Sequence, residues 1–338
     1  MDPDVRGWGV AMRAVRRQVL VRTGAALAAA VTVATLASPP AGAATAIKWG
    51  ADVHATAKQV PMAAILALQA KVGRTLAATR DFLAWDSPFP TSYENALKAQ
   101  GTTILLSVAT NTLAKAPLQW ADIAAAQPGS ALYAQMVSWA DRVRDFGVPI
   151  YVTMNHEPET VKNGQEGTAP QYIAAWQNWV SIFRAEGATN VKFLWISTAN
   201  AFRVASTDRR YGPKWYPGDA YVDAIGTDAY NYYTCRAGIN TPWRSLQWLI
   251  EGARQFLLQH PGKEGWIPEF GSVADPADAT RRASWITDAE TLFKQPGYER
   301  YAGVLYFDIV GTCQTKIDAD AQAVAAFAAM GQDPYYAG

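Results

Sequence analysis

The sequence predicts an α/β protein in which residues 45–338 form one (β/α)8 TIM barrel. Two observations lead to this fold class. Eight short runs rich in β-branched and aromatic residues recur along the chain, and segments with helical periodicity fill most of the gaps between them. The 338 residues, of which 50% are hydrophobic and 17% charged, also provide enough apolar material for a large core. No linker divides the region, so we expect a single domain.

A secretory signal peptide is predicted over residues 1–44. Arginines are concentrated in the first 22 residues, an Ala/Val/Leu run follows at 25–37, and small residues at 41–44 offer a cleavage site. We therefore expect a secreted, extracellular protein that uses the Sec route. Because Arg16 and Arg17 form a pair before the apolar run, the twin-arginine route is the alternative. The mature chain is expected to have no membrane attachment.

The eight predicted strands lie at regular intervals, and seven helices lie between or after them. The strands are Ile47–Val53, Gly73–Ala77, Thr103–Val108, Pro149–Asn155, Val191–Ser197, Val222–Tyr230, Trp266–Phe270 and Ala302–Asp308. The helices are Val60–Ala70, Tyr93–Gln100, Leu132–Phe146, Gln171–Glu186, Trp243–His260, Ala279–Lys294 and Ala321–Met330. The gap between residues 197 and 222 is rich in Pro, Gly and charge, so its helix is expected to be short or missing.

A doubly wound open sheet has the same alternation of strands and helices and is the competing architecture. The chain lacks the G-x-G-x-x-G, G-x-x-x-x-G-K-[ST] and G-x-S-x-G motifs that usually accompany such sheets. The count of eight strands also favours the closed barrel.

Charge and cysteine content exclude several classes of function. Lys and Arg total 30 against 29 Asp and Glu, so the chain has no surplus of positive charge for nucleic acid. Cys235 and Cys313 are the only cysteines, and in an exported protein they are expected to form a disulfide. The three histidines form no H-x-x-x-H pair, so no metal site is predicted.

Carboxylates at the predicted strand ends are the candidate catalytic groups, because barrel enzymes place their chemistry there. Glu157 follows the fourth strand and Glu269 lies in the seventh, whereas Asp228 and Asp308 are expected to have structural roles. Two glutamates from these strands could face each other across the barrel axis, as a retaining glycosidase requires. Tyr230, at the end of the sixth strand, is the candidate hydrogen-bond donor to Glu269.

The sequence resembles glycoside hydrolase family 26, a clan A family. The resemblance rests on Asn155-His156-Glu157, on residues 215–230 with the pattern P-G-D-x-Y-V-D-x-x-G-x-D-x-Y, and on Glu269. It implies that Glu157 is the acid/base, that Glu269 is the nucleophile, and that His156, Tyr230 and Asn155 contact substrate or its catalytic groups. Because family members mostly cleave β-mannans, it also implies a polysaccharide substrate, most often β-mannan. We expect the enzyme to act in endo mode and as a monomer, and chemistry with two glutamates requires no cofactor.

Two departures from the family pattern keep alternatives open. Residues 158–164 replace the usual Asn-Gly and closely spaced tryptophans, and Phe307 stands where clan members commonly carry Trp under the sugar. Phe307 and the loop aromatics Trp85, Trp215 and Tyr216 are the predicted stacking residues. The alternatives are another clan A β-glycanase, such as a glucanase or xylanase, and a non-catalytic carbohydrate-binding barrel.

Overall fold

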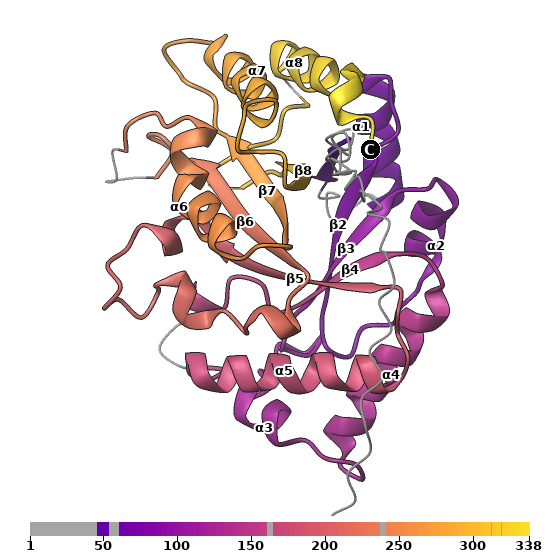
Figure 1. The fold of residues 1–338 in the computed structure, drawn as a ribbon. Coiled ribbons are helices and arrows are strands. Elements are labelled where there is room, and N and C mark those ends of the chain that lie inside the picture. Colours follow the sequence, from indigo (N-terminus) through magenta and orange to yellow (C-terminus); the bar gives the residue numbers. More distant parts are fainter. Residues whose placement is uncertain (1–45, 54–60, 161–164, 237–240, 312, 319) are drawn as a thin grey trace, which may run out of the picture. The chain divides into compact units, whose positions relative to one another are not determined.

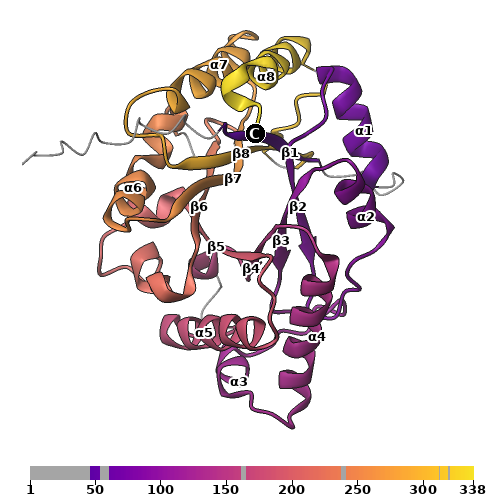
Figure 2. The same ribbon diagram turned by 45° about the vertical axis from the view of Figure 1, so that its right-hand side comes forward.

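The computed structural model describes residues 46–53, 61–160, 165–236, 241–311, 313–318 and 320–338. Within these ranges, eight parallel strands form a closed barrel in the order β1 to β8. Figure 2 shows the strands arranged in a ring, with the helices on its outside. The predicted (β/α)8 fold is therefore confirmed, whereas the predicted signal peptide lies outside the described residues.

The elements follow one another in the expected alternation along the chain (Figure 1). The strands are β1 (Lys48–Val53), β2 (Ala78–Leu83), β3 (Thr103–Val108), β4 (Ile150–Met154), β5 (Val191–Thr198), β6 (Ala224–Asn231), β7 (Glu264–Ser272) and β8 (Tyr301–Asp308). The α-helices are α1 (Pro61–Val72), α2 (Ser92–Ala99), α3 (Trp120–Ala125), α4 (Ala131–Phe146), α5 (Ala169–Ala185), α6 (Leu246–Gln259), α7 (Arg281–Phe293) and α8 (Ala321–Gln332).

The predicted position of the second strand is wrong. Instead of Gly73–Ala77, the strand is β2, Ala78–Leu83, which begins directly after the predicted segment. Gly73 has a φ of +68°, a conformation that ends α1 at low cost, and the Leu76 amide bonds to the Gln69 side chain 2.9 Å away. The predicted segment is therefore the turn that connects α1 to β2.

Two other regions differ in helix content from a regular barrel. The segment between β5 and β6, which the structure describes throughout, contains three short 3-10 helices and no α-helix, as its composition indicated. The sequence analysis did not predict α3, which is only six residues long. Its Trp120 is fully buried and packs edge-on against Tyr172 of α5 at 5.1 Å, so α3 forms a second layer outside α5 (Figure 1).

Two separate groups of buried side chains form the core. The larger group fills the space between the strands and the surrounding helices. The smaller group fills the barrel interior and consists of Ala78, Leu105, Tyr151, Leu194, Ile196, Ala224, Trp266 and Leu305. Trp266 needs Gly303 beside it, because a Cβ there would lie 2.2 Å from the indole ring. The interior is therefore packed, and it supports the residues above it.

The helices begin and end at residues that suit their termini. Thr91 caps α2 with Glu94 in a capping box, and Ser130 and Ser245 cap α4 and α6. Gly147 ends α4 in the left-handed conformation. Among the described residues, no helix combines the length and apolar character needed to cross a membrane.

Candidate active site at the carboxyl ends of the strands

Three carboxylates from three strand ends meet over the barrel. Glu157 follows β4, Asp228 lies on β6 and Glu269 lies on β7. One carboxylate oxygen of each lies within 4.8 Å of the others. Retaining glycosidases hold two carboxyl groups about 5–5.5 Å apart, so the spacing of Glu157 and Glu269 is in the range for a double displacement.

An unusual backbone conformation places Glu157 in this group. Asn155 and Glu157 have φ angles of +48° and +50°, which non-glycine residues seldom adopt. The backbone N–H of Asn155 donates to the Val108 carbonyl at 2.8 Å, and the backbone N–H of Glu157 donates to the Ile196 carbonyl at 2.9 Å. The turn is therefore fixed between β3 and β5. The Asn155 side chain accepts a 3.0 Å bond from the Thr110 hydroxyl, so it helps to hold this turn.

A buried arginine, Arg80 of β2, holds the other two carboxylates in place. Its Nη1 lies 2.6 Å from Oε1 of Glu269 and 3.2 Å from Oδ2 of Asp228. Its Nε donates to the Ser107 hydroxyl at 2.9 Å, and its guanidinium lies 4.6 Å from the centre of the Phe82 ring. A single cation thus compensates two buried carboxylates, which would otherwise be costly to ionise.

Tyr230 makes the contact that the sequence analysis expected. Its hydroxyl donates a hydrogen bond to Oε2 of Glu269, the oxygen that Arg80 leaves free. Both oxygens of Glu269 are therefore bound to donors that favour the ionised form. An ionised carboxylate in this position can act as a nucleophile.

Glu157 has the opposite environment. Burial, together with the negative charge of Glu269, raises the pKa of Glu157 to about 8. A carboxyl group with this pKa is mostly protonated at neutral pH and can donate its proton. Burial and the nearby Arg80 charge lower the pKa of His156 well below its usual value, so this imidazole is neutral. His156 packs edge-on against Phe82 at 5.3 Å.

Two cavities open beside the carboxylates. One, of about 350 Å³, is lined by Glu157, Glu269, Tyr230 and Phe307 among others. The other, of about 650 Å³, extends from Glu157, Asp228 and Tyr230 over the ends of β5 and β6. Phe307 lies where a sugar at the reacting centre could contact it, and its ring packs edge-on against Tyr230 at 5.6 Å.

The predicted stacking role is wrong for Trp85 and Trp215. Their exposed fractions are only 3% and 5%, so neither ring offers a face to substrate. Trp85 packs on Trp179 at 5.0 Å, and Trp215 packs against Trp120 at 5.8 Å, both in the helical shell.

Among the described residues, Tyr216 is not one of those that line either cavity. Its ring packs 5.2 Å from both Trp195 and Phe256, and its hydroxyl donates to Asp219 at 2.6 Å. Its predicted contact with substrate is therefore corrected to packing between β5 and α6.

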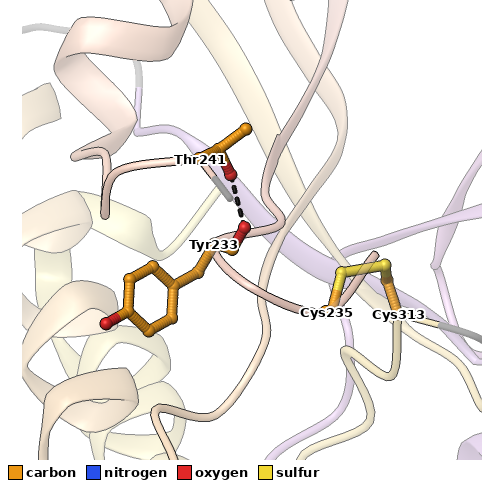
Figure 3. Close-up of a disulfide and its surroundings, with 4 residues drawn as sticks. All are labelled: Tyr233, Cys235, Thr241 and Cys313. Atoms are coloured by element: carbon orange, nitrogen blue, oxygen red, sulfur yellow. Dashed lines mark hydrogen bonds between the residues drawn. A yellow bond between two sulfur atoms is a disulfide. The ribbon is translucent and has the colours of Figure 1, made fainter. Parts of the chain in front are cut away.

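The predicted disulfide between Cys235 and Cys313 is present, with a Cα–Cα distance of 5.3 Å. Figure 3 shows that it joins the loop after β6, which also carries Tyr233 and Thr241, to the loop after β8. Within the first loop, the Thr241 hydroxyl donates to the Tyr233 carbonyl. The bridge therefore ties together two loops on either side of β7, the strand that carries Glu269.

The sequence analysis missed Arg80 and Tyr232. Arg80 was overlooked because the second strand was placed five residues too early, in the turn before it. The adjacent charges of Arg80 and Asp81 within a barrel strand are the signal that could have identified it. Tyr232 stacks on Tyr230 with ring centres 5.2 Å apart and lines both cavities.

The three carboxylates are also the one group of described residues whose ligand atoms are close enough to hold a metal ion. Arg80 already bonds to two of them and supplies the positive charge that an ion would bring. The donor set therefore fits an acid, a nucleophile and a buried cation, and it needs no metal.

Comparison with known proteins agrees with this geometry. An eight-stranded barrel that brings a glutamate after β4 close to another on β7 supplies the two carboxyl groups that a retaining glycoside hydrolase requires. Residues 115–269 match the family model of glycosyl hydrolase family 26. The matched segment contains Glu157, Asp228 and Glu269, so the carboxylates of the site lie in the part of the chain that resembles this family.

A curated relative and several solved structures are similar to the chain. Endoglucanase H of Acetivibrio thermocellus is 26% identical over 273 residues, which is 78% of this chain but only 28% of the relative. The catalytic domain of an endo-β-1,4-mannanase from Bacillus sp. JAMB-750 superposes with a TM-score of 0.58 at 17% identity, covering 86% of each chain. A β-mannanase from Bacteroides ovatus gives 0.55 at 17% identity, covering 86% of this chain and 90% of the other. These structural neighbours share the fold.

Proposed function

We propose that the protein cleaves β-linked polysaccharide in endo mode with retention of configuration, and that this polysaccharide is a β-mannan. The observation that carries this proposal is the contrast between the two glutamates. Glu269 is bonded through both oxygens to Arg80 and Tyr230, whereas burial raises the pKa of Glu157 to about 8. One is prepared to attack and the other to donate a proton.

In the first step, a carboxylate oxygen of Glu269 bonds to the anomeric carbon while the bond from that carbon to the leaving oxygen breaks. The Glu157 proton passes to the leaving oxygen, so the departing chain leaves as a neutral alcohol. The product is a glycosyl ester on Glu269, and Glu157 is now a carboxylate.

In the second step, Glu157 takes a proton from water, and the oxygen of this water attacks the anomeric carbon. The ester bond breaks, and the electron pair returns to Glu269. Arg80 and Tyr230 stabilise the carboxylate at the start and at the end of the cycle, because their bonds to it are strongest when it is charged. Two inversions give net retention.

The choice of β-mannan as the substrate rests on structural neighbours that are endo-β-1,4-mannanases, from Bacillus sp. JAMB-750 and Cellulomonas fimi. A second candidate is a β-glucan, because a curated relative, Endoglucanase H of Acetivibrio thermocellus, is named as an endoglucanase. We further propose that the enzyme is secreted and acts as a monomer. The disulfide supports export to an oxidising compartment, and one chain supplies every residue of the site.

Reducing-end release from β-mannan, β-glucan and β-xylan tests the proposal. We expect activity on β-mannan, and we expect Glu269→Ala to abolish it without a change in thermal unfolding. Glu264→Gln, at the other end of β7, is the matched control and should retain activity. Full activity of Glu269→Ala would refute the assignment. Glycan binding without any product release would identify a non-catalytic binding barrel.

A further inference from the structure

The larger cavity beside the carboxylates has an unusual charge. Four arginines line it, namely Arg203, Arg210, Arg236 and Arg244, together with Trp248. Arg210 forms an ion pair with Asp208 at 2.8 Å. Across the described ranges, the other three arginines have no ion pair. The adjoining stretches 161–164 and 237–240, outside the described residues, contain no Asp or Glu.

The acidic residues of the same cavity do not offset these charges. The raised pKa of Glu157 keeps that side chain mostly neutral at neutral pH. Asp228 is bonded to Arg80, and Glu159 is buried with its Oε1 bonded to the amide and hydroxyl of Thr198. The wall of the cavity therefore carries positive charge that the described protein groups leave uncompensated.

Two of the arginines are held together on one exposed ring. The guanidinium carbons of Arg203 and Arg244 lie 3.1 Å and 3.9 Å from the centre of the Trp248 ring, which is 40% exposed. Burial and the neighbouring charge of Arg244 lower the pKa of Arg203, as expected of like charges held close together. An anion bound beside these two arginines would relieve this repulsion and form charge-assisted hydrogen bonds.

The third arginine lies closer to the reacting groups. Arg236 lines both cavities, and its guanidinium lies 4.0 Å from the centre of the Tyr232 ring. It directly follows Cys235, so the disulfide to Cys313 holds its backbone at the rim. Positive charge therefore extends through the larger cavity from Trp248 toward the carboxylates.

We propose that the substrate is an anionic β-glycan, whose sugars carry carboxylate or sulfate groups that bind to Arg203, Arg244 and Arg236. This inference rests on the proposed function and specifies its substrate class. A neutral mannan has no charged group that would pair with three arginines that lack a carboxylate partner among the described residues. Carboxylates and sulfates both match the fork of N–H donors that an arginine presents.

Binding can be compared for three β-1,4-linked manno-oligosaccharides of equal length. One is neutral, one is oxidised at C6 to the uronic acid, and one is sulfated at O6. Calorimetry with the Glu269→Gln variant measures affinity without turnover. We expect a charged ligand to bind at least about tenfold more tightly than the neutral one, which corresponds to about 1.4 kcal/mol. The better of the two charged ligands identifies the natural substituent.

Substitutions and salt then test the origin of that preference. Arg203→Gln and Arg244→Gln in the same background should each reduce the ratio of charged to neutral affinity about tenfold. Arg142→Gln is the matched control, because Arg142 also lies on a tryptophan ring, Trp139 at 3.9 Å, but in the helical shell. With the arginines intact, raising the ionic strength from about 0.01 M to about 1 M should remove most of the preference.

Equal or tighter binding of the neutral oligosaccharide would overturn the inference. A charge preference that survives both arginine substitutions would also overturn it. Hydrolysis separates this failure from failure of the proposed function. Cleavage of neutral mannan without any charge preference would refute only the anionic substrate. Absence of cleavage for all three chains by the unmodified protein would refute the catalytic proposal.

Discussion

Arg80 of β2 and Glu269 of β7 form a buried ion pair, with Nη1 and Oε1 2.6 Å apart, although β1 and β8 separate their strands in the barrel. The same Nη1 also reaches Asp228 of β6. This arrangement fixes the carboxylate that we assign as nucleophile and keeps it charged inside the protein. The stability of the barrel and its chemistry therefore depend on one side chain.

Replacing Arg80 by Met should destabilise the fold by about 3–5 kcal/mol, because two buried carboxylates lose their cation. Urea unfolding measures this change. Adding Asp228→Asn to Arg80→Met should recover part of the loss, since one uncompensated charge is removed. Lys192→Met, which breaks the exposed pair with Glu264, should cost at most about 1 kcal/mol. An equally small cost for Arg80→Met would contradict this account.

Tyr230→Phe should lower kcat about 10²-fold, because Glu269 loses one of the two donors that hold its charge. KM should change little, since the ring and its stacking on Tyr232 remain. Steady-state kinetics on the active glycan provides the measurement. Tyr216→Phe also removes a carboxylate-bound hydroxyl, but outside the cavities, so its kinetics should match the unmodified enzyme. A kcat for Tyr230→Phe within twofold of that enzyme would show that the hydroxyl is dispensable.

Activity should fall with increasing pH around a pKa of about 8, because only protonated Glu157 can donate to the leaving oxygen. The group is protonated below that pH and loses its proton above it, so kcat/KM should show a basic limb there. Glu157→Ala should slow cleavage of poor leaving groups by about 10²–10⁴-fold and of activated aryl leaving groups much less. It should also remove the basic limb. Persistence of that limb in Glu157→Ala would assign it to another group.

Removing the disulfide with Cys235→Ser and Cys313→Ser should lower the free energy of unfolding by up to about 4 kcal/mol, as the loop-entropy relation gives for a separation of 78 residues. Chemical denaturation of the double variant measures the loss. The same loop carries Arg236, so binding of charged oligosaccharide should weaken as well. If the free energy of unfolding and the affinity for charged oligosaccharide both stay unchanged, the disulfide stabilises neither the fold nor the binding site.

The sequence could predict the barrel and the two glutamates because both depend on local patterns. Regular strand spacing and carboxylates at strand ends are visible along the chain. Arg80 could not be identified in this way, because its partners lie 148 and 189 residues away. The misplaced second strand removed the remaining clue.

The aromatic residues show a second limit of the sequence. Trp85 and Trp215 follow strands, as substrate-stacking residues often do, but both rings are turned into the helical shell. Exposure of a loop side chain depends on packing between distant helices. Trp248 shows the reverse case, because it lies on helix α6 and its ring is nevertheless 40% exposed beside the cavity.

Trapping of the covalent intermediate tests the central claim most directly. A 2-deoxy-2-fluoro β-glycosyl fluoride of the active sugar should accumulate as an ester, because the fluorine slows its hydrolysis. Peptide mapping by mass spectrometry then locates the label. The account predicts one sugar per chain, attached to Glu269. A label on another residue, or turnover with inversion and no label, would contradict it.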